Sequence, residues 1–445
     1  MMRSVSHLPE IDGKPYSSFS KKTRNRICII TSAPVCCNPR VLKEADVLSG
    51  SGFDVRVIAS EHVLWTVRWD IELMEPRKWT LQSVRWDSDD PKARRTRLYS
   101  GLRQRVFQLL AGGITYDRGL AERAYCRMYS EQLRLAVAQK ADLYIAHNPQ
   151  ALPVAAAAAQ QHGTRFAFDS EDYHCGEFVG DSKDLPPFRL LSYLERKYLR
   201  ECAYVSSPSD QISRVLAKRY GIRMPLTVHN CFALADRFKL DGKTYDRRGN
   251  PLSLYWYSQR IGLDRGIQDV IRAASIINRP IQIHLRGDVS HSVQNELLTL
   301  AREHSVADMI FFHPIVRPTE LLSRAVEHDV GLALESNLTE NKSLTVSNKL
   351  FTYLLAGLAI AASGTVGQRF ILENVPGAGF VYPCGDYSSL AVKLRSLADA
   401  PELLRQHKET ALAAAKNRWN WELESTHLVE YIASEIFRTK RVRSA

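Results

Sequence analysis

The stretch RICIITSAPVCCNPRVLKEADVLSGSGFDVRVIA, residues 26–59, contains two short apolar runs joined by a segment with helical spacing. Residues 27–31 and 54–59 are apolar runs bounded by turn residues, a pattern typical of buried strands. Between them, apolar residues recur at helical spacing over 41–48, and two glycines end the predicted helix. A strand, a helix and a second strand in this order predict the βαβ unit of a parallel, doubly wound sheet.

The same alternation returns along the rest of the chain. The first half adds strands at 143–146 and 165–168 with an Ala-rich helix near 150–161. The second half adds strands at 252–257, 281–285, 309–312, 329–334 and 358–362, and helices near 266–276, 318–327 and 347–357. The pattern therefore predicts an α/β protein with two Rossmann-like, doubly wound sheets.

The length of 445 residues exceeds what one hydrophobic core usually supports, so we expect two domains. Residues 233–250 interrupt the periodicity with charges and glycines and are predicted to be the linker. The predicted organisation is an N-terminal arm at 1–24, domains at 25–232 and 251–418 on either side of the linker, and a C-terminal helical segment at 419–445.

The composition favours a protein that meets anionic partners inside the cell. Lys and Arg outnumber Asp and Glu by 60 to 48, and the eight cysteines show no C-x-x-C spacing. No signal peptide or apolar run long enough to span a membrane is present in the sequence, so we expect a cytoplasmic protein whose membrane contact, if any, is peripheral. The basic segment 92–110 fits either an amphipathic helix at an acidic membrane surface or a solvated basic loop.

A site for a diphosphate is predicted at the start of the helix SNKLFTYLLAG, residues 347–357. Ser347 or Asn348 can cap this helix, yet Lys349 in its first turn opposes the helix dipole unless an anion compensates. Arg260 and Arg265 follow the strand at 252–257 and offer planar donor forks that match phosphate oxygens. The three cations together could stabilise a departing nucleoside diphosphate without a metal. An exposed lysine on a buried helix is the alternative interpretation of Lys349.

These residues resemble the GT-B glycosyltransferases, specifically the nucleotide-sugar-dependent glycosyltransferase family 4 group. The resemblance rests on motifs in the family's order, namely Asn38-Pro-Arg-Val-Leu-Lys-Glu-Ala45, Gly52-Phe-Asp-Val55, Arg260 with Arg265-Gly266, Leu285-Arg-Gly287, His313-Pro314, Asp329-Val-Gly-Leu-Ala-Leu334, Ser347-Asn-Lys-Leu-Phe351, Ala356-Gly357 and Trp419-Asn-Trp-Glu422. It implies a GT-B fold with a C-terminal helix that crosses back to the first domain. It also implies donor contacts from Gly287, His313, Ser347, Asn348, Lys349 and Thr352.

One departure from the family pattern concerns the donor ribose. The family usually carries two glutamates with seven residues between them, the second of which holds the ribose, and this sequence has Thr345 and Thr352 as the matching residues. A threonine hydroxyl can still bind a sugar hydroxyl, but a neutral partner gives about half the strength of a charged one. The substitution leaves the donor identity and turnover itself open.

The acceptor is predicted to meet the loops of the first domain. Glu171, Asp172 and His174 follow the strand at 165–168, and any of them could accept a proton from the attacking hydroxyl or hold the transferred sugar. Asn38 and Arg40 are acceptor candidates in the loop after the first strand, although Asn38 also suits a helix cap before Pro39. His147 is a further candidate, with a structural role as the alternative.

The predicted reaction is transfer of a sugar from a nucleoside diphosphate sugar to a hydroxyl on a saccharide or lipid-linked acceptor, with no metal or other cofactor. The resemblance implies retention at the anomeric carbon and a place in cell-surface polysaccharide or glycolipid synthesis. A noncatalytic GT-B protein that binds a glycan or a partner is the main alternative. An epimerase would need bases on both faces of the sugar, and only one acidic cluster is visible. Nucleic acid is not expected as a partner, because no recognition motif accompanies the dispersed basic residues.

Overall fold

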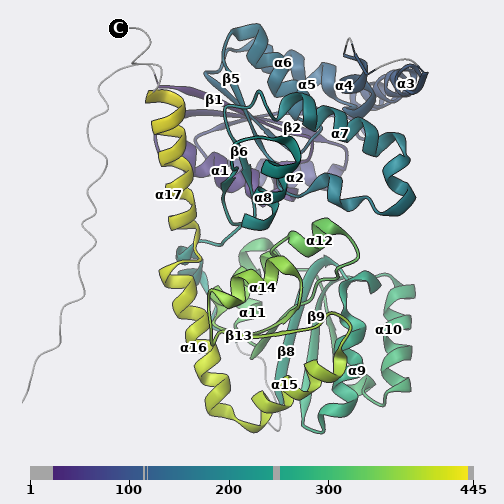
Figure 1. Ribbon diagram of the computed structural model, residues 1–445, viewed down its shortest axis with the longest axis vertical. Helices are drawn as coiled ribbons and strands as arrows, with labels where there is room; N and C mark the ends of the chain where they lie inside the picture. The colour runs from purple at the N-terminus through teal and green to yellow at the C-terminus, as the bar shows by residue number, and fades with distance from the viewer. Residues whose placement is uncertain (1–23, 114–115, 118, 244–250, 439–445) are drawn as a thin grey trace, which may run out of the picture.

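The computed structural model describes residues 24–113, 116–117, 119–243 and 251–438. They form two α/β units, one above the other in Figure 1, with the last long helices running along one side of both. The predicted N-terminal arm, except for Arg24, lies outside the described residues. So do residues 244–250 of the predicted linker and residues 439–445 of the C-terminal segment.

The N-terminal sheet has seven strands in the order β3-β2-β1-β4-β5-β6-β7, and every neighbouring pair is parallel. Its strands are β1 (Arg26–Thr31), β2 (Asp54–Glu61), β3 (Thr80–Arg85), β4 (Leu143–His147), β5 (Arg165–Asp169), β6 (Val205–Ser207) and β7 (Leu226–Thr227). Its helices are α1 (Pro39–Gly50), α2 (Leu64–Met74), α3 (Pro91–Gly113), α4 (Leu120–Tyr125), α5 (Tyr129–Ala138), α6 (Leu152–His162), α7 (Pro186–Tyr198) and α8 (Asp210–Tyr220). The short 3-10 turns η1 (Val35–Cys37), η2 (His174–Glu177) and η3 (Gly180–Asp184) lie in its loops.

The C-terminal sheet has six parallel strands in the order β10-β9-β8-β11-β12-β13. Its strands are β8 (Leu252–Arg260), β9 (Ile281–Asp288), β10 (Ile310–His313), β11 (Val330–Ala333), β12 (Ala359–Ser363) and β13 (Gly379–Tyr382). Its helices are α9 (Ile267–Ile277), α10 (His291–Glu303), α11 (Leu321–Ala325), α12 (Glu340–Leu344), α13 (Asn348–Ala356), α14 (Val366–Glu373), α15 (Tyr387–Asp399) and α16 (Pro401–Asn417). The 3-10 turns η4 (Leu234–Lys239), η5 (Leu263–Arg265), η6 (Ala307–Met309) and η7 (Pro318–Glu320) complete the connections.

These two doubly wound sheets confirm the predicted α/β class. The central strands are buried on both faces, as parallel sheets covered by helices require, and β1, β4 and β12 each show five consecutive buried residues. The helix predicted near 318–327 is instead the 3-10 turn η7 followed by the short α11, and Pro318 stands at the first position of the turn, where a proline is tolerated. The basic segment 92–110 lies within the helix α3, so its interpretation as a loop is wrong.

Helix α13 is the most enclosed helix next to the predicted diphosphate site. Seven of its nine residues are buried, and its C-cap Gly357 has φ 73°, the left-handed conformation expected of a helix stop. Tyr353 packs so tightly over β11 that a Cβ at Gly331 would lie 2.2 Å from its ring. This packing fixes the direction in which the start of α13 points.

The chain ends by returning to the N-terminal domain. Helix α17 (Trp421–Tyr431) follows α16, and a π-helical turn, η8 (Ile432–Arg438), continues it. Leu428, Ile432 and Ile436 pack in the same apolar cluster as Ile27 and Ile29 of β1. The yellow helices α16 and α17 therefore span both domains along one side in Figure 1.

Candidate functional site

The loops after the strands of the two sheets meet where helix α12 of the C-terminal domain touches η2 of the N-terminal domain. Asn341 of α12 is buried, donates from Nδ2 to Asp172 at 3.2 Å and to Glu177, and accepts from the backbone N–H of Tyr173 at 2.8 Å. Because ligands in open α/β sheets collect beyond the carboxyl ends of the strands, this domain junction is where a ligand site is expected.

Two cations of the predicted donor site lie close together on the C-terminal side. Lys349 in the first turn of α13 has Nζ at 3.6 Å from Glu335 Oε1 and above the ring of Trp256. Burial lowers the pKa of Lys349, Glu335 opposes this, and the nearby charge of Arg265 lowers it further. The side chain of Arg265 is about one third exposed, and within the part of the chain that the structure describes its only ion pair is with Asp264, at 3.6 Å. A lysine with only 12% of its side chain exposed, beside an arginine, favours an anionic ligand between them.

Arg260, the third predicted cation, lies at the exposed end of β8. No hydrogen bond or ion pair of its side chain is found among the described residues, so its guanidinium is available to a ligand. The side chain of Ser347 does not cap α13. The first N–H groups of α13 therefore lack a side-chain acceptor from the cap residue, which leaves the positive end of the helix dipole beside Lys349.

Gly287 and His313 line the neighbouring strands. A Cβ at Gly287 would lie 2.5 Å from the carbonyl oxygen of Ser258, so this position needs glycine for β8 and β9 to approach each other. His313 Nε2 lies 2.9 Å from His284 Nδ1, and burial together with the charge of Arg286 lowers the pKa of His313. The imidazole of His313 is therefore held neutral at the end of β10.

Thr352 is buried, whereas a hydroxyl that binds the donor ribose would have to be accessible to the ligand. Its side chain is buried, and its Oγ1 lies 2.6 Å from Tyr257 Oη and 3.3 Å from the carbonyl oxygen of Asn348. The hydroxyl is thus already used inside the domain. With seven residues between the two glutamates of the family pattern, the partner of Thr352 is Leu344, and the match to Thr345 is wrong by one position. Thr345 instead contacts Asn341 and Asp172 at the domain junction.

On the N-terminal side, Glu171 and His147 form the centre of a polar network. His147 is completely buried, with Nδ1 at 2.9 Å from Glu171 Oε1 and Nε2 at 2.9 Å from Glu44 Oε2. Burial disfavours the charged imidazole, but the two carboxylates outweigh it and raise the pKa of His147 to about 10. Asn38 caps α1 by accepting from Val41 N and also donates to Glu171 at 2.6 Å, so its capping role is confirmed.

Arg40 is buried and binds Asp169 of this network, so it does not face the domain junction. Both Arg40 and Asp169 are buried, and two hydrogen bonds of 2.7 Å join the guanidinium to the two carboxylate oxygens. Burial alone would raise the pKa of Asp169, but the charges of Arg40 and His147 hold it well below its usual range. Asp169 also accepts from Ser206 at 2.8 Å and from the backbone N–H of Glu171 at 3.1 Å. These bonds hold Glu171 in its left-handed conformation, φ 57°.

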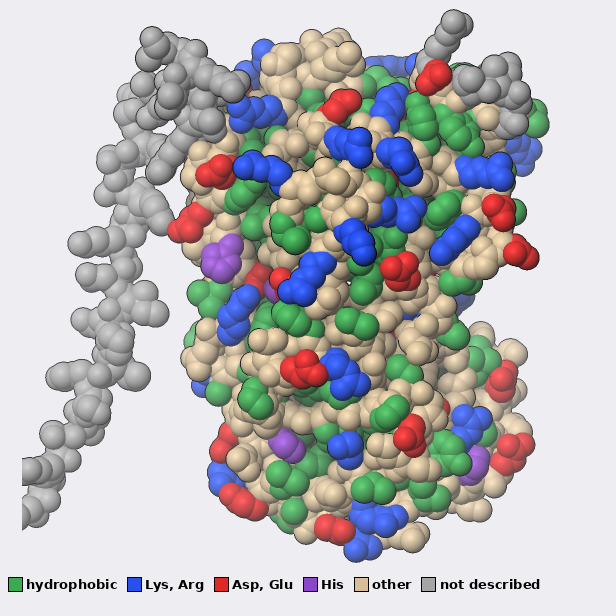
Figure 2. Space-filling view, in the orientation of Figure 1, with side chains coloured by type: hydrophobic (Ala, Val, Ile, Leu, Met, Phe, Trp, Pro, Cys, Tyr) green, Lys and Arg blue, Asp and Glu red, His purple; other side chains and the backbone are tan. Residues whose placement is uncertain are grey.

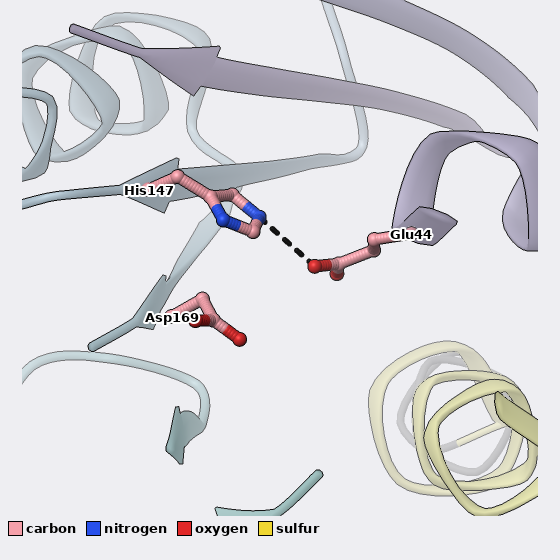
Figure 3. Close-up of side chains that lie close together, drawn as sticks. All are labelled: Glu44, His147 and Asp169. Carbon is pink, nitrogen blue, oxygen red and sulfur yellow. Dashed lines mark hydrogen bonds and ion pairs between the residues drawn. The ribbon is translucent and has the colours of Figure 1, made fainter. Parts of the chain in front are cut away.

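Glu44, His147 and Asp169 are the group among the described residues whose spacing suits a metal ion, and Figure 3 shows them converging from α1, β4 and β5. Their ligand atoms are used by protein partners, however. Both ring nitrogens of His147 face carboxylates, and both oxygens of Asp169 accept from Arg40. A guanidinium in this position repels a cation, so the cluster fits a charge-balanced scaffold and not a metal centre.

The remaining acidic-loop residues point away from Glu171. Asp172 faces Asn341 across the domain junction, and burial raises the pKa of Asp172. His174 Nε2 donates to the carbonyl oxygen of Ser170 at 2.6 Å. The structure therefore brings Asn38, His147 and Glu171 together, and it places Asp172 and His174 beside them with other partners.

Sequence reasoning missed Glu44, Tyr257, Glu335 and Asn341. Glu44 lies four residues after Arg40, one turn further along the same face of α1, and Glu335 follows the carboxyl end of β11. Both positions could have been found from these placements. Tyr257 and Asn341 act through contacts with residues distant in the sequence, and no local pattern marks them.

Residues 37–231 match the profile of the family described as "Glycosyl transferase 4-like domain". This match and the GT-B fold confirm the predicted resemblance. A comparison with curated protein sequences finds no match.

Solved structures with the same fold include sucrose-phosphate synthase from Thermosynechococcus elongatus, with TM-score 0.63, 14% identity, and coverage of 92% of this chain and 99% of that one. Alr3699/HepE from Anabaena, in complex with UDP and glucose, has TM-score 0.64 and 14% identity over 92% of this chain and 100% of its own. The lipopolysaccharide outer core galactosyltransferase WaaB has TM-score 0.59 and 12% identity over 92% and 99%. At these identities the likeness establishes the GT-B fold.

Proposed function

We propose that this chain, which has the GT-B fold and a glycosyl transferase 4-like N-terminal domain, transfers a sugar from a nucleoside diphosphate sugar to a hydroxyl acceptor. The observation that carries the proposal is the pair Arg265 and Lys349 at the start of α13, with Arg260 at the exposed end of β8, the strand whose Trp256 ring lies below Lys349. Among the described residues the guanidinium of Arg260 has no side-chain partner and that of Arg265 has a weak one, and the ammonium of Lys349 is largely enclosed next to the helix start. Such a site favours a diphosphate.

In the proposed reaction, the bond between the anomeric carbon and the diphosphate oxygen breaks, and the electron pair leaves with the nucleoside diphosphate. Arg260, Arg265 and Lys349 neutralise the charge that develops on this leaving group. The acceptor oxygen forms the new bond to the anomeric carbon on the face from which the diphosphate leaves, as the proposed retention requires, and its proton passes to a base. No cofactor takes part in this scheme, in which the nucleotide sugar is a substrate.

The base is proposed to be Glu171 or Asp172. His147 cannot accept a proton at neutral pH, because its raised pKa of about 10 keeps it an imidazolium. Glu171 is held toward the loop surface by Asn38 and His147, with 16% of its side chain exposed. Burial raises the pKa of Asp172, which favours proton acceptance by its carboxylate, and the contact with Asn341 would have to open for an acceptor to reach it.

Retention at the anomeric carbon and a role in cell-surface polysaccharide or glycolipid synthesis are parts of the proposal. The family resemblance supports retention. WaaB, named for the lipopolysaccharide outer core, and HepE, seen with UDP and glucose, share the fold and support this acceptor class and a UDP-linked donor. All eight cysteines are free thiols, which suits the reducing cytoplasm as the place of reaction.

A noncatalytic binding protein is the second candidate, and the Thr352 contact favours it. The Thr352 hydroxyl is buried and bonded to Tyr257, so it offers a donor ribose less than a free carboxylate would. In this candidate the domain junction holds a nucleotide or glycan without turnover.

A thermal-shift titration with UDP, GDP, dTDP and their sugars tests the proposal. Bound ligand raises the melting temperature by mass action, by an amount equivalent to about 2.7 kcal/mol at a hundredfold excess over Kd. We expect one nucleotide to stabilise the native protein and to lose most of that effect in Arg265→Ala. The matched control Arg302→Ala removes an exposed arginine of α10 and should leave the shift unchanged. Absence of a shift with every nucleotide would refute the donor site.

A further inference from the structure

Helix α3 presents an apolar stripe to solvent. Leu98, Leu102 and Leu109 have 67%, 65% and 79% of their surface exposed. Tyr99 and Val106 are also exposed, at 71% and 46%. Spacings of three, four and seven residues place these side chains on one side of a helix, so they form a continuous band along α3. Contiguous apolar surface of this kind is unusual on a soluble monomer and marks an interaction site.

The opposite side of α3 is fastened to the N-terminal domain. Ser100 is completely buried, and Gln104 and Gln108 donate to the carbonyl oxygen of Ala124 in α4 at 3.1 Å and 3.3 Å. Arg103 forms an ion pair of 2.7 Å with Glu131 of α5. These contacts fix the rotation of α3 about its axis. The apolar stripe therefore faces outward as a consequence of the packing.

The charge of α3 is entirely positive. Residues 91–113 contain six Lys and Arg residues and no Asp or Glu. Five of the six have exposed side chains, namely Lys92, Arg94, Arg95, Arg97 and Arg105, and they flank or interrupt the stripe. Figure 2 shows that Lys and Arg side chains are spread widely over the N-terminal domain, the upper half of the view.

We propose that α3 docks the protein on a bilayer with anionic headgroups, with the stripe at the boundary between headgroups and acyl chains. A membrane surface of this kind uses both features of the helix, since leucines enter the acyl boundary while arginines meet phosphates. Nucleic acid or an acidic polysaccharide would use the arginines and leave the leucines in water. A second copy that paired stripe to stripe would bring the two sets of arginines together.

The helix would lie on the membrane and not cross it. No helix among the described residues is long and apolar enough to span a bilayer. In Figure 1, α3 lies at the end of the N-terminal domain that is distant from the C-terminal domain. Docking through α3 would therefore leave the C-terminal domain free of the bilayer. This inference does not depend on sugar transfer, because it rests on the surface of α3 alone.

Co-sedimentation with vesicles tests the inference on the full chain. We expect binding to phosphatidylcholine vesicles that contain about 30% phosphatidylglycerol, and at least tenfold weaker binding to pure phosphatidylcholine vesicles, given about fivefold per basic residue at the surface. Leu98→Ser with Leu109→Ser should weaken binding to the anionic vesicles by about tenfold or more. Arg94→Gln with Arg95→Gln should weaken it by a factor on the order of 25. The control Val392→Ser, at a residue of α15 that is 61% exposed, should bind like the native protein.

A fluorescence measurement separates insertion from adsorption by charge. In Leu102→Trp, insertion of the stripe predicts a blue shift with anionic vesicles and quenching by brominated acyl chains. Adsorption without the shift would overturn the insertion of the stripe. If the Leu98→Ser, Leu109→Ser variant bound anionic vesicles as well as the native protein does, insertion of the stripe would also be overturned. A dimer of the native protein in light scattering that this variant abolishes would overturn it as well. All these residues are exposed, so an unchanged melting temperature is expected for each variant and verifies that it is folded.

Discussion

Replacing Arg40 with methionine would leave Asp169 as a buried carboxylate without its counter-ion. The two residues are 5% and 2% exposed, and their two 2.7 Å hydrogen bonds form the closest ion pair of the N-terminal network. Arg40 also donates to the carbonyl oxygen of Val228 at 2.6 Å, which links the end of the N-terminal sheet to α1. Breaking a buried pair by removing one partner costs about 3–5 kcal/mol.

We therefore expect Arg40→Met to lower the melting temperature of the N-terminal domain by about 6–20 °C, at about 2–4 °C per kcal/mol for a domain of this size. The double variant Arg40→Met with Asp169→Leu removes both charges and should recover most of that loss. Differential scanning calorimetry of the native, single and double variants gives the comparison. A loss below about 1 kcal/mol in Arg40→Met would refute the reasoning, because it would mean that the pair behaves like an exposed one.

Three further predictions concern the rest of the site. The pKa of His147 is raised from 6.5 to about 10 in the folded protein. Its contribution to the free energy of unfolding is therefore complete below pH 6.5 and is lost as the pH rises to 10. The corresponding fall in melting temperature should be absent in His147→Gln. Tyr257→Phe removes one partner of Thr352 and should cost about 0.5–1.5 kcal/mol of unfolding free energy in denaturant titration, and a stabilised variant would contradict that bond. Asn341→Ala removes the contacts that hold α12 to η2 and should increase the radius of gyration in small-angle scattering, whereas Asn337→Ala, at an exposed position, should match the native protein.

The α/β fold could be predicted from the sequence because its periodic segments are long and strongly apolar. The strand predicted at 143–146 became Leu143–His147, and that predicted at 281–285 became Ile281–Asp288. Each observed strand is longer than predicted by polar residues at its carboxyl end, where the chain leaves the core. Four strands were missed. The strands β6 and β7 have three and two residues, too few to show a period, and the edge strands β3 and β13 are only partly buried.

The candidate site could be predicted from the sequence only in part. Lys349 was found through its mismatch with the helix dipole, and Glu171 through its place after a strand. The partners that decide what these residues do are distant in the sequence. Asn341 is separated from Asp172 by 169 positions, and Tyr257 from Thr352 by 95. Local spacing carries no information on such pairs, so the use of Thr352 and Asp172 within the protein could only be seen in the structure.

The most direct test of the account is a turnover assay with UDP-, GDP- and dTDP-sugars that detects the free nucleoside diphosphate. The account predicts slow release of nucleoside diphosphate from one donor, acceleration by a saccharide or lipid-linked acceptor, and loss of release in Arg265→Ala and in Lys349→Met, with Arg302→Ala as the active control. Binding of a nucleotide with no release from any donor, in the presence of such acceptors, would contradict sugar transfer and would identify the chain as a binding protein.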